Sequence, residues 1–495
     1  MRSEVRTTGG TVRGTVTDGL AAFLGIPYAE PPSGELRFQA PRVRAPWDGV
    51  LDATRFSPSP PQAADVSVPP PPEGVPADDY LSVNVWTPAE DGERLPVLVW
   101  VHGGGFVAGT SADPSFEPST LARQARVVVV SMNYRVGVEG FGLIEGAPPN
   151  RGLLDVVAAL EWAEANVAAF GGDPGNLTVY GQSAGAGTVA ALLSMPANER
   201  FWSRAILSSV PCLYFTPALA ASCGEKIAAA AGVANTLTEM AGVAPDALVR
   251  AMDEVAGEQP GFRSWGRAAH GTLMGPVVDG EVLPQAPWQA LADGALAGKP
   301  LLIGHTRDEF TLFMHRRGIL GEITPEQAET ALSGLAPRGG ADYRAAFPDA
   351  SPEELYTLVN SDWMFRMPTI RLAQLHQGPT YLYELAHTVP VADGKLGAPH
   401  CSDLPLVFGD FREGLGVELY AGEPSADDRR LGEMMRAAWA SFLLDGDPGW
   451  TPYDLDEQPA RIFTSAESVV TAPYPETASQ AVWDGFPWEA MDLRE

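Results

Sequence analysis

One serine stands between two glycines at the junction of two hydrophobic patterns. The segment NLTVYGQSAGAGTVAALLSMP, residues 176–196, begins like a buried strand and continues like a buried helix. Gly181-Gln182-Ser183-Ala184-Gly185 at the junction fits G-x-S-x-G, a tight turn that exposes a serine hydroxyl at the end of a strand. Packing alone is the alternative explanation, since small residues let a helix lie close to a sheet. The pattern predicts a strand, a sharp turn and a helix, with Ser183 as a candidate nucleophile.

Several other apolar runs bounded by turn residues predict buried strands. With the run already described, they cover residues 95–104, 125–134, 176–181, 203–210, 299–306 and 380–389. Between two of these runs, residues 150–172 carry apolar side chains at helical spacing and end in Gly171 and Gly172. Strand, helix and strand repeated in this way predict an α/β protein with a large central, mostly parallel sheet and helices on both faces.

A helix-rich insertion is predicted at roughly residues 215–375, interrupted by the strand at 299–306. TPEQ at Thr324 and SPEE at Ser351 each place a capping hydroxyl before proline and an acceptor shortly after it, which predicts two helix starts. Helices inserted beside a parallel sheet often cover the mouth of a pocket. For any single helix, plain packing is an equally good explanation.

The segment 57–80 is rich in proline and resembles a linker. It is better explained as a loop, because the apolar strands that would pair with the residues before it come after it. We therefore expect one catalytic domain that spans residues 1–495.

The charge balance limits the partners of this chain. It has 33 basic and 62 acidic residues, a formal net charge of −29. Such a surface repels phosphate backbones, which argues against nucleic-acid binding and disfavours anionic substrates. High negative charge otherwise indicates little more than solubility.

Cysteine use is sparse. Cys212, Cys223 and Cys401 cannot all pair with one another, and the spacings CxxC and HExxH are absent, so we expect no disulfide framework and no metal cluster. The start MRSEVRTTGG lacks the pattern of a secretion signal, and no apolar run is long enough to span a membrane. We expect a cytoplasmic protein without a membrane partner.

A serine nucleophile needs a histidine base and an acid that orients the base. In folds that use the G-x-S-x-G turn, the chain order is serine, acid, histidine. Asp308 and Glu309 end the run LLIGHTRDE and are the candidate acids. Adjacent side chains point to opposite sides, so only one of the two can face the base, and the pattern does not choose between them.

The candidate bases beyond this acid are His315, His376, His387 and His400. His315 follows the acid too closely, and His376 lies in a helix-like stretch where a surface histidine is the usual explanation. His387 and His400 both follow the strand-like TYLYEL. The loop GAPHCSDLPLVFG favours His400, because a glycine-flanked turn can bring its ring over the edge of the sheet.

The segment VHGGGFVAG, residues 101–109, offers bare backbone amides at Gly104 and Gly105, and Ala184 offers another. Such amides can stabilise a developing oxyanion. The same glycines also fit the dinucleotide fingerprint G-x-G-x-x-G/A. That fingerprint requires a helix immediately afterwards, whereas turn formers follow here, so the nucleotide explanation is rejected. Together the parts indicate acyl transfer.

In these motifs and others along the chain, the sequence resembles the type-B carboxylesterase family of the α/β-hydrolase fold, which includes the cholinesterases. The matching motifs, in chain order, are FLGIPYAEPPSGELRF, DDYLSVNVWTP, HGGGF, NYRVGVEGF, NRGLLDVVAALEW, FGGDPGNLTVYGQSAG, PVVDG, GHTRDEF, GAPHCSDLPLVFG and DGDPGW. The resemblance implies that Glu309 is the acid, that His400 is the base, and that Ser209 lies near the acid and supports it. It also implies an oxyanion site at the three amides already named.

The chain departs from the family pattern at several positions. Gln182 stands where the family usually has glutamate, and we expect an active enzyme with an altered pH response. Tyr80 replaces a cysteine that closes a disulfide loop in many secreted members, and the loop at 57–80 has no tryptophan to hold a quaternary ammonium, which argues against choline esters. The resemblance also implies buried ion pairs, and the residues concerned are Arg37, Asp78, Arg135 and Asp173.

The sequence therefore predicts a serine carboxylesterase that hydrolyses neutral esters through Ser183, His400 and Glu309 with an acyl-enzyme intermediate. This mechanism needs no metal and no cofactor. The GGG loop is associated in related esterases with room for bulky alcohol groups, which makes tertiary or aryl esters a hypothesis. Two alternatives remain: a carbamate or amide hydrolase with the same triad, and a non-catalytic binding protein of the same fold. The expected partner is a small ester substrate, and the protein is expected to be a monomer or a weak homo-oligomer.

Overall fold

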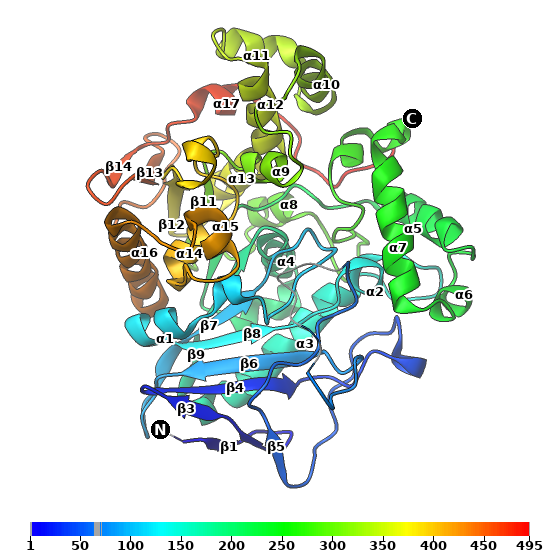
Figure 1. Ribbon diagram of the computed structural model, residues 1–495, viewed down its shortest axis with the longest axis vertical. Helices are drawn as coiled ribbons and strands as arrows, with labels where there is room; N and C mark the ends of the chain where they lie inside the picture. Colours follow the sequence, from blue (N-terminus) through cyan, green and yellow to red (C-terminus); the bar gives the residue numbers. More distant parts are fainter. Residues whose placement is uncertain (1, 64–69, 71, 495) are drawn as a thin grey trace.

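A large mixed sheet runs through the protein, as the computed structural model in Figure 1 shows. The structure describes residues 2–63, 70 and 72–494. From one edge to the other, the sheet consists of β14 (Val470–Pro473), β13 (Pro459–Phe463), β12 (Thr380–Leu385), β11 (Leu301–Thr306), β10 (Arg204–Ser208), β9 (Gly172–Gln182), β7 (Leu95–Val101), β8 (Val128–Met132), β6 (Ser82–Thr87), β4 (Leu20–Pro27) and β3 (Thr15–Thr17). The predicted strands of the centre are confirmed.

The pairing directions give the fold class. The strands from β8 to β13 pair in parallel, whereas β14, β6, β4 and β3 add antiparallel edges. A separate small sheet contains β1 (Glu4–Arg6), β2 (Thr11–Arg13) and β5 (Val50–Asp52). The predicted α/β class with a mostly parallel sheet is confirmed, and the antiparallel edges make the sheet mixed.

Both faces of the sheet are covered, because strand side chains alternate between faces. In β7, Val97 and Val99 belong to one apolar cluster, and Leu98 and Trp100 belong to another. The first cluster includes α3 (Arg151–Asn166) and α4 (Ala184–Leu193), and the second includes α1 (Ser119–Ala125), α14 (Asp403–Phe408) and α16 (Ala426–Asp445). A near-continuous apolar strand is the expected pattern for a sheet buried on both sides.

Helices dominate the chain between β10 and β12. They are α5 (Pro217–Ala230), α6 (Leu237–Ala241), α7 (Pro245–Glu258), α8 (Pro287–Ala292), α9 (Thr311–Arg316), α10 (Pro325–Leu335), α11 (Gly340–Ala346), α12 (Pro352–Ser361), the π-helix η7 (Asp362–Arg366) and α13 (Met367–Leu375). In Figure 1, α5 to α7 lie at the right and α10 to α12 at the top. Full capping boxes begin α10 at Thr324 and α12 at Ser351, which confirms both predicted starts.

The expected buried ion pairs are only partly present. Arg135 pairs with Asp155, and both side chains are fully buried. By contrast, Asp78 is exposed, and its neighbour Asp79 pairs with Arg44 instead, so the expectation for Asp78 was wrong.

The other two expected positions have opposite outcomes. Arg37 forms an ion pair with Glu139 across 2.7 Å, and both side chains are largely buried, so the expectation for Arg37 is confirmed. Asp173 accepts a hydrogen bond from the amide of Gly175, and it forms no ion pair within the part of the chain that the structure describes. The carboxylate of Asp173 thus holds a turn, and the expectation of a buried ion pair was wrong there as well.

The topology brings distant segments to one edge of the sheet. Parallel strands end at the same edge, and loops at the carboxyl ends of such strands are the usual position of a ligand site. Here Val101 of β7 lies beside Gly181 of β9, and Ser208 of β10 lies beside Gln182 of β9 and Gly304 of β11. Residues that follow β7, β9, β10, β11 and β12 therefore meet above this edge. Among the described residues, we find no helix with the length and apolar character needed to cross a membrane.

Candidate active site

Ser183 lies at the sharp turn between β9 and α4. Its backbone has φ 56° and ψ −130°, a conformation that non-glycine residues rarely adopt. A Cβ at Gly181 would lie 2.3 Å from the carbonyl oxygen of Gly185, and a Cβ at Gly185 would lie 2.1 Å from the carbonyl oxygen of Val101. The turn therefore requires both glycines, and it holds the serine at the carboxyl edge of the sheet.

Glu309 follows β11 and is fully buried. Its Oε2 contacts Nδ1 of His400, and its Oε1 accepts hydrogen bonds from the Ser209 hydroxyl at 2.6 Å and the Thr306 amide at 3.0 Å. The amide of His400 also donates to the Glu309 carbonyl oxygen at 3.2 Å. These contacts fix the orientation of both side chains.

The same contacts shift the pKa of each partner. Burial raises the pKa of Glu309, but the nearby His400 ring and the hydrogen bonds from His400 and Ser209 outweigh burial, so the pKa is lowered overall. Burial lowers the pKa of His400, but Cys401 and Glu309 beside it favour the charged ring, so its pKa is raised above 6.5. The carboxylate thus stabilises an imidazolium, which an acid in a triad must do.

The second ring nitrogen of His400 faces the strand that carries the serine. Nε2 lies 3.2 Å from Nε2 of Gln182, the residue directly before Ser183. Within the described part of the chain, no hydrogen bond joins the Ser183 hydroxyl to His400. The candidate base and the candidate nucleophile are therefore neighbours without a direct bond, a common arrangement in active sites before a substrate binds.

Two aromatic rings from the helix-rich segment pack against the His400 imidazole. The Phe365 ring stacks on it with centroids 4.3 Å apart, and the Phe313 ring lies 5.3 Å away. Phe365 is in η7 and Phe313 is in α9. These contacts restrict the plane of the imidazole and shield its contact with Glu309 from water.

The glycine loop after β7 lies next to the nucleophile. A Cβ at Gly103 would lie 3.1 Å from the Cβ of Ser183. Gly104 and Gly105 have φ of 120° and 63°, which only glycine adopts without strain. Neither amide donates a hydrogen bond to any described residue, and Ala184 begins α4, where a backbone amide lacks a partner within the helix. These amides are available to an oxyanion.

The other candidates from the sequence lie outside this arrangement. Asp308 accepts a hydrogen bond from the amide of Ala398 at 2.9 Å and so anchors the loop before His400. His376 bonds to Thr380, and His387 bonds to Asp428 across 2.6 Å.

The last candidate base, His315, is exposed at the end of α9. The structure thus brings Glu309, rather than Asp308, into contact with a histidine, and that histidine is His400.

Sequence reasoning missed Asp403, which is buried at the start of α14. The Tyr383 hydroxyl donates to its Oδ2 at 3.0 Å, and its Oδ1 has no hydrogen-bond partner among the described residues. Burial, with the charge of Glu309 adding to it, raises the pKa of Asp403 to about 6. In the sequence, the one feature that could have pointed to Asp403 is its position three residues after His400. No spacing rule identifies Phe313 or Phe365, because their helices meet the base only through the tertiary fold.

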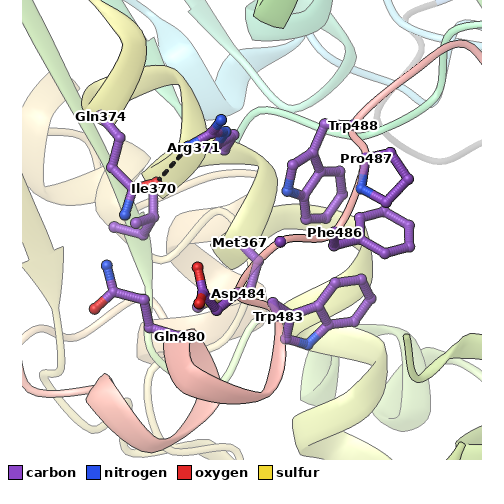
Figure 2. Close-up of a pocket in the computed structure, with 11 residues that line it drawn as sticks. Met367, Ile370, Arg371, Gln374, Gln480, Trp483, Asp484, Phe486, Pro487 and Trp488 are labelled. Carbon is purple, nitrogen blue, oxygen red and sulfur yellow. Dashed lines mark hydrogen bonds between the residues drawn. The ribbon is translucent and has the colours of Figure 1, made fainter. Parts of the chain in front are cut away.

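A separate pocket of about 340 Å³ lies between α13 and the C-terminal segment. Figure 2 shows the rings of Trp483, Phe486 and Trp488 gathered on one side and Arg371 with Gln374 on the other. None of the proposed catalytic or oxyanion residues lines it. The candidate site at the carboxyl edge of the sheet is therefore separate from this pocket.

Comparison with known proteins gives an independent result. Residues 1–471 match the model of the carboxylesterase family. The chain is 34% identical over 494 residues to the para-nitrobenzyl esterase of Bacillus subtilis (strain 168), with 95% of this chain and 96% of the relative covered. It is also 34% identical over 462 residues to the phenmedipham hydrolase of Pseudarthrobacter oxydans, with 90% and 91% covered.

Solved structures agree with this result. The crystal structure of a Geobacillus stearothermophilus carboxylesterase superposes with a TM-score of 0.85 at 31% identity and covers 98% of this chain and 100% of that chain. A solved para-nitrobenzyl esterase gives a TM-score of 0.85 at 32% identity and covers 98% and 100%. The similarity extends over the whole sheet and the helical segments that surround it.

Proposed function

The chain belongs to the carboxylesterase family and is a carboxylic ester hydrolase, and we propose that it hydrolyses neutral esters with Ser183 as nucleophile, His400 as base and Glu309 as the acid that orients the base. The net charge of −29 supports neutral rather than anionic substrates. The observation that carries the proposal is the contact of Glu309 with Nδ1 of His400, while Nε2 of the same ring faces the residue beside Ser183.

In the acylation step, Nε2 of His400 takes the proton of the Ser183 hydroxyl as the oxygen attacks the ester carbonyl carbon. The carbonyl oxygen becomes an oxyanion and accepts hydrogen bonds from Gly104, Gly105 and Ala184. Removing one such donor typically costs about 10²- to 10³-fold in kcat. The bond to the alcohol oxygen then breaks, and the imidazolium gives its proton to the leaving alcohol. Ser183 is left as an ester of the acyl group.

In the deacylation step, water takes the place of the alcohol. His400 removes a proton from the water, whose oxygen attacks the acyl carbon, and the oxyanion again accepts the same amide hydrogen bonds. Collapse breaks the bond to the serine oxygen, and the imidazolium returns the proton to Ser183. The carboxylate of Glu309 stabilises the imidazolium in both halves, and the products are one carboxylic acid and one alcohol.

The substrate proposal follows the relatives. Identity of 34% to a para-nitrobenzyl esterase supports para-nitrobenzyl esters as the first substrates to test. We further propose that bulky aryl or tertiary alcohol groups are accepted. A panel in which only small linear esters react would contradict this part of the proposal.

Labelling with a fluorophosphonate tests the catalytic assignment. We expect one adduct on Ser183 and loss of at least about a thousandfold in esterase activity for Ser183→Ala. Activity that survives in Ser183→Ala, or an adduct at another serine, would overturn the assignment. Absence of any adduct together with absence of hydrolysis would favour a binding protein of the same fold.

We also propose a single catalytic domain and a cytoplasmic location. The proposed site uses residues from Gly104 to His400, which supports one catalytic unit. Cys212, Cys223 and Cys401 are all unpaired, which agrees with a reducing compartment. Fractionation of the cells that produce the protein tests the location.

A further inference from the structure

Gln182 connects three parts of the proposed site. Its Nε2 lies 3.2 Å from Nε2 of His400, and both side chains are buried. Its Oε1 lies on the opposite side, toward the glycine loop, where a Cβ at Gly103 would be 3.1 Å away. The Gln182 side chain thus lies between His400 and the glycine loop, and Gln182 directly precedes Ser183 in the chain.

The chemistry of the two nitrogens restricts the state of the ring. An amide nitrogen can only donate a hydrogen bond, so Nε2 of His400 must accept. This hydrogen bond therefore requires a neutral ring whose single proton is on Nδ1, where Glu309 accepts it. This is the tautomer that a general base needs before it takes a proton from a hydroxyl.

We propose that Gln182 is a positioning residue that favours the neutral ring of His400 and holds its Nε2 away from Ser183 until substrate binds. In this role it acts against Cys401 and Glu309, which favour the charged ring. The inference rests on the proposed function. Because Nε2 accepts from Gln182 at rest, attack requires a change of partner, in which the ring leaves the amide and accepts the serine proton. The absence of a bond from Ser183 to His400 among the described residues agrees with this resting arrangement.

The charges around His400 explain why an amide differs from a carboxylate at this position. Glu309 faces the ring from the loop after β11, and Cys401 and Asp403 face it from its own segment. The rings that pack on it from α9 and η7, Phe313 and Phe365, are uncharged. Gln182 faces the ring from β9 and is also uncharged. Its N–H groups point at Nε2 and therefore disfavour a proton on that nitrogen.

A glutamate at position 182 would act in the opposite way. A carboxylate can only accept, so it would favour the imidazolium and raise the pKa of His400, typically by about 1 to 3 units for an opposite charge at this separation. Since only the neutral ring can act as base, activity would then begin at higher pH. With the amide at this position, the acid limb of the pH profile lies at lower pH than it would with a carboxylate.

The test compares pH profiles of kcat/KM for the natural chain, Gln182→Glu and Gln182→Met. We expect the acid limb of Gln182→Glu to move up by about 1 to 3 pH units. Gln182→Met, which removes the donor without adding charge, is expected to move the limb upward by less. Gln374→Glu, in the pocket of Figure 2, adds the same charge elsewhere and is expected to leave the limb in place.

Coincident acid limbs for the natural chain and Gln182→Glu would overturn the inference. Fluorophosphonate labelling of Ser183 is measured on the same samples, so a labelled enzyme with coincident limbs sinks the inference alone, whereas failure to label the natural chain sinks the proposed function. If Gln182→Glu does not fold, ¹⁵N NMR of the histidine rings in the natural chain decides. A His400 ring protonated on Nδ1 alone near neutral pH supports the inference, and a doubly protonated ring contradicts it.

Discussion

Ser209 donates its hydroxyl to Oε1 of Glu309 across 2.6 Å, on the side of the carboxylate away from His400. Ser209 itself follows β10 with φ 54°, a conformation uncommon for serine. Its amide donates to the carbonyl oxygen of Gly304 on β11 at 2.8 Å. The strained backbone thus serves to aim one hydroxyl at the proposed catalytic acid.

Ser209→Ala is expected to lower kcat by roughly 10- to 100-fold, because a hydrogen bond to a buried charge is worth about 1.5 to 3 kcal/mol. Loss of this donor also raises the pKa of Glu309, since the bond favours the ionised carboxyl. Steady-state kinetics across pH provide the measurement. Ser194→Ala is the matched control: it removes a buried hydroxyl bonded to Ala190 at 2.9 Å and should leave kcat nearly unchanged. Equal effects of the two substitutions would refute the specific role.

The sequence predicted the centre of the fold well for a physical reason. Strands buried on both faces, such as β7 and β8, are continuous apolar runs that turns interrupt, so their positions can be read locally. The edge strands are short and partly exposed. For example, β3 is exposed throughout and β14 nearly so, and such strands carry no comparable pattern.

The site divides in the same way. The turn that holds Ser183 could be predicted because the steric requirement for Gly181 and Gly185 is local and is visible within five residues of sequence. The contact of Glu309 with His400 joins residues 91 positions apart, and that of Gln182 with His400 joins residues 218 positions apart. No local pattern encodes contacts at such separation, which is why a family resemblance was needed to choose the acid.

Gly185→Ala is expected to prevent the native turn. A Cβ there would lie 2.1 Å from the carbonyl oxygen of Val101, the last residue of β7, and 2.7 Å from the carbonyl oxygen of His102. Neither backbone group can move aside easily in the packed interior. We expect little folded protein, or a large fall in the midpoint of thermal unfolding together with loss of activity. Gly257→Ala provides the comparison, since its Cβ would meet nothing within 4 Å in α7. There we expect stabilisation by about 0.5 to 1 kcal/mol. Similar unfolding midpoints for the two variants would contradict the steric argument.

His387 and Asp428 form a partly buried pair that is expected to make stability depend on pH. Burial lowers the pKa of His387, but the hydrogen bonds to Asp428 and to the Thr464 carbonyl outweigh it and raise the pKa above 6.5. A raised histidine pKa means that the added stability is complete below pH 6.5 and disappears as pH rises through the folded value.

Denaturant unfolding of the natural chain and His387→Gln measures this contribution. We expect His387→Gln to be less stable by about 1 to 2 kcal/mol at mildly acidic pH, with a smaller difference in alkaline solution. The pKa of Asp428 is lowered in the fold despite its burial, so the stability that ionised Asp428 contributes is lost in strong acid. The measurement at acidic pH must therefore stay well above 3.8, the ordinary pKa of aspartate. A difference that is constant, or that grows with pH, would contradict the assignment.

Asp308 and Glu309 are adjacent acids with different contacts, and paired substitutions separate their roles. Glu309→Gln removes the charge that stabilises the His400 imidazolium, and we expect kcat to fall by about 10³- to 10⁴-fold, as for the corresponding acid in other triads.

Asp308 accepts a hydrogen bond from the amide of Ala398. An asparagine oxygen can accept the same bond, so Asp308→Asn should retain kcat within about tenfold. Asp308→Ala leaves that amide without its acceptor and should lower both stability and kcat, because the loop before His400 loses its anchor. A larger loss for Asp308→Asn than for Glu309→Gln would mean that Asp308 rather than Glu309 acts as the acid, and the assignment of Glu309 would fail.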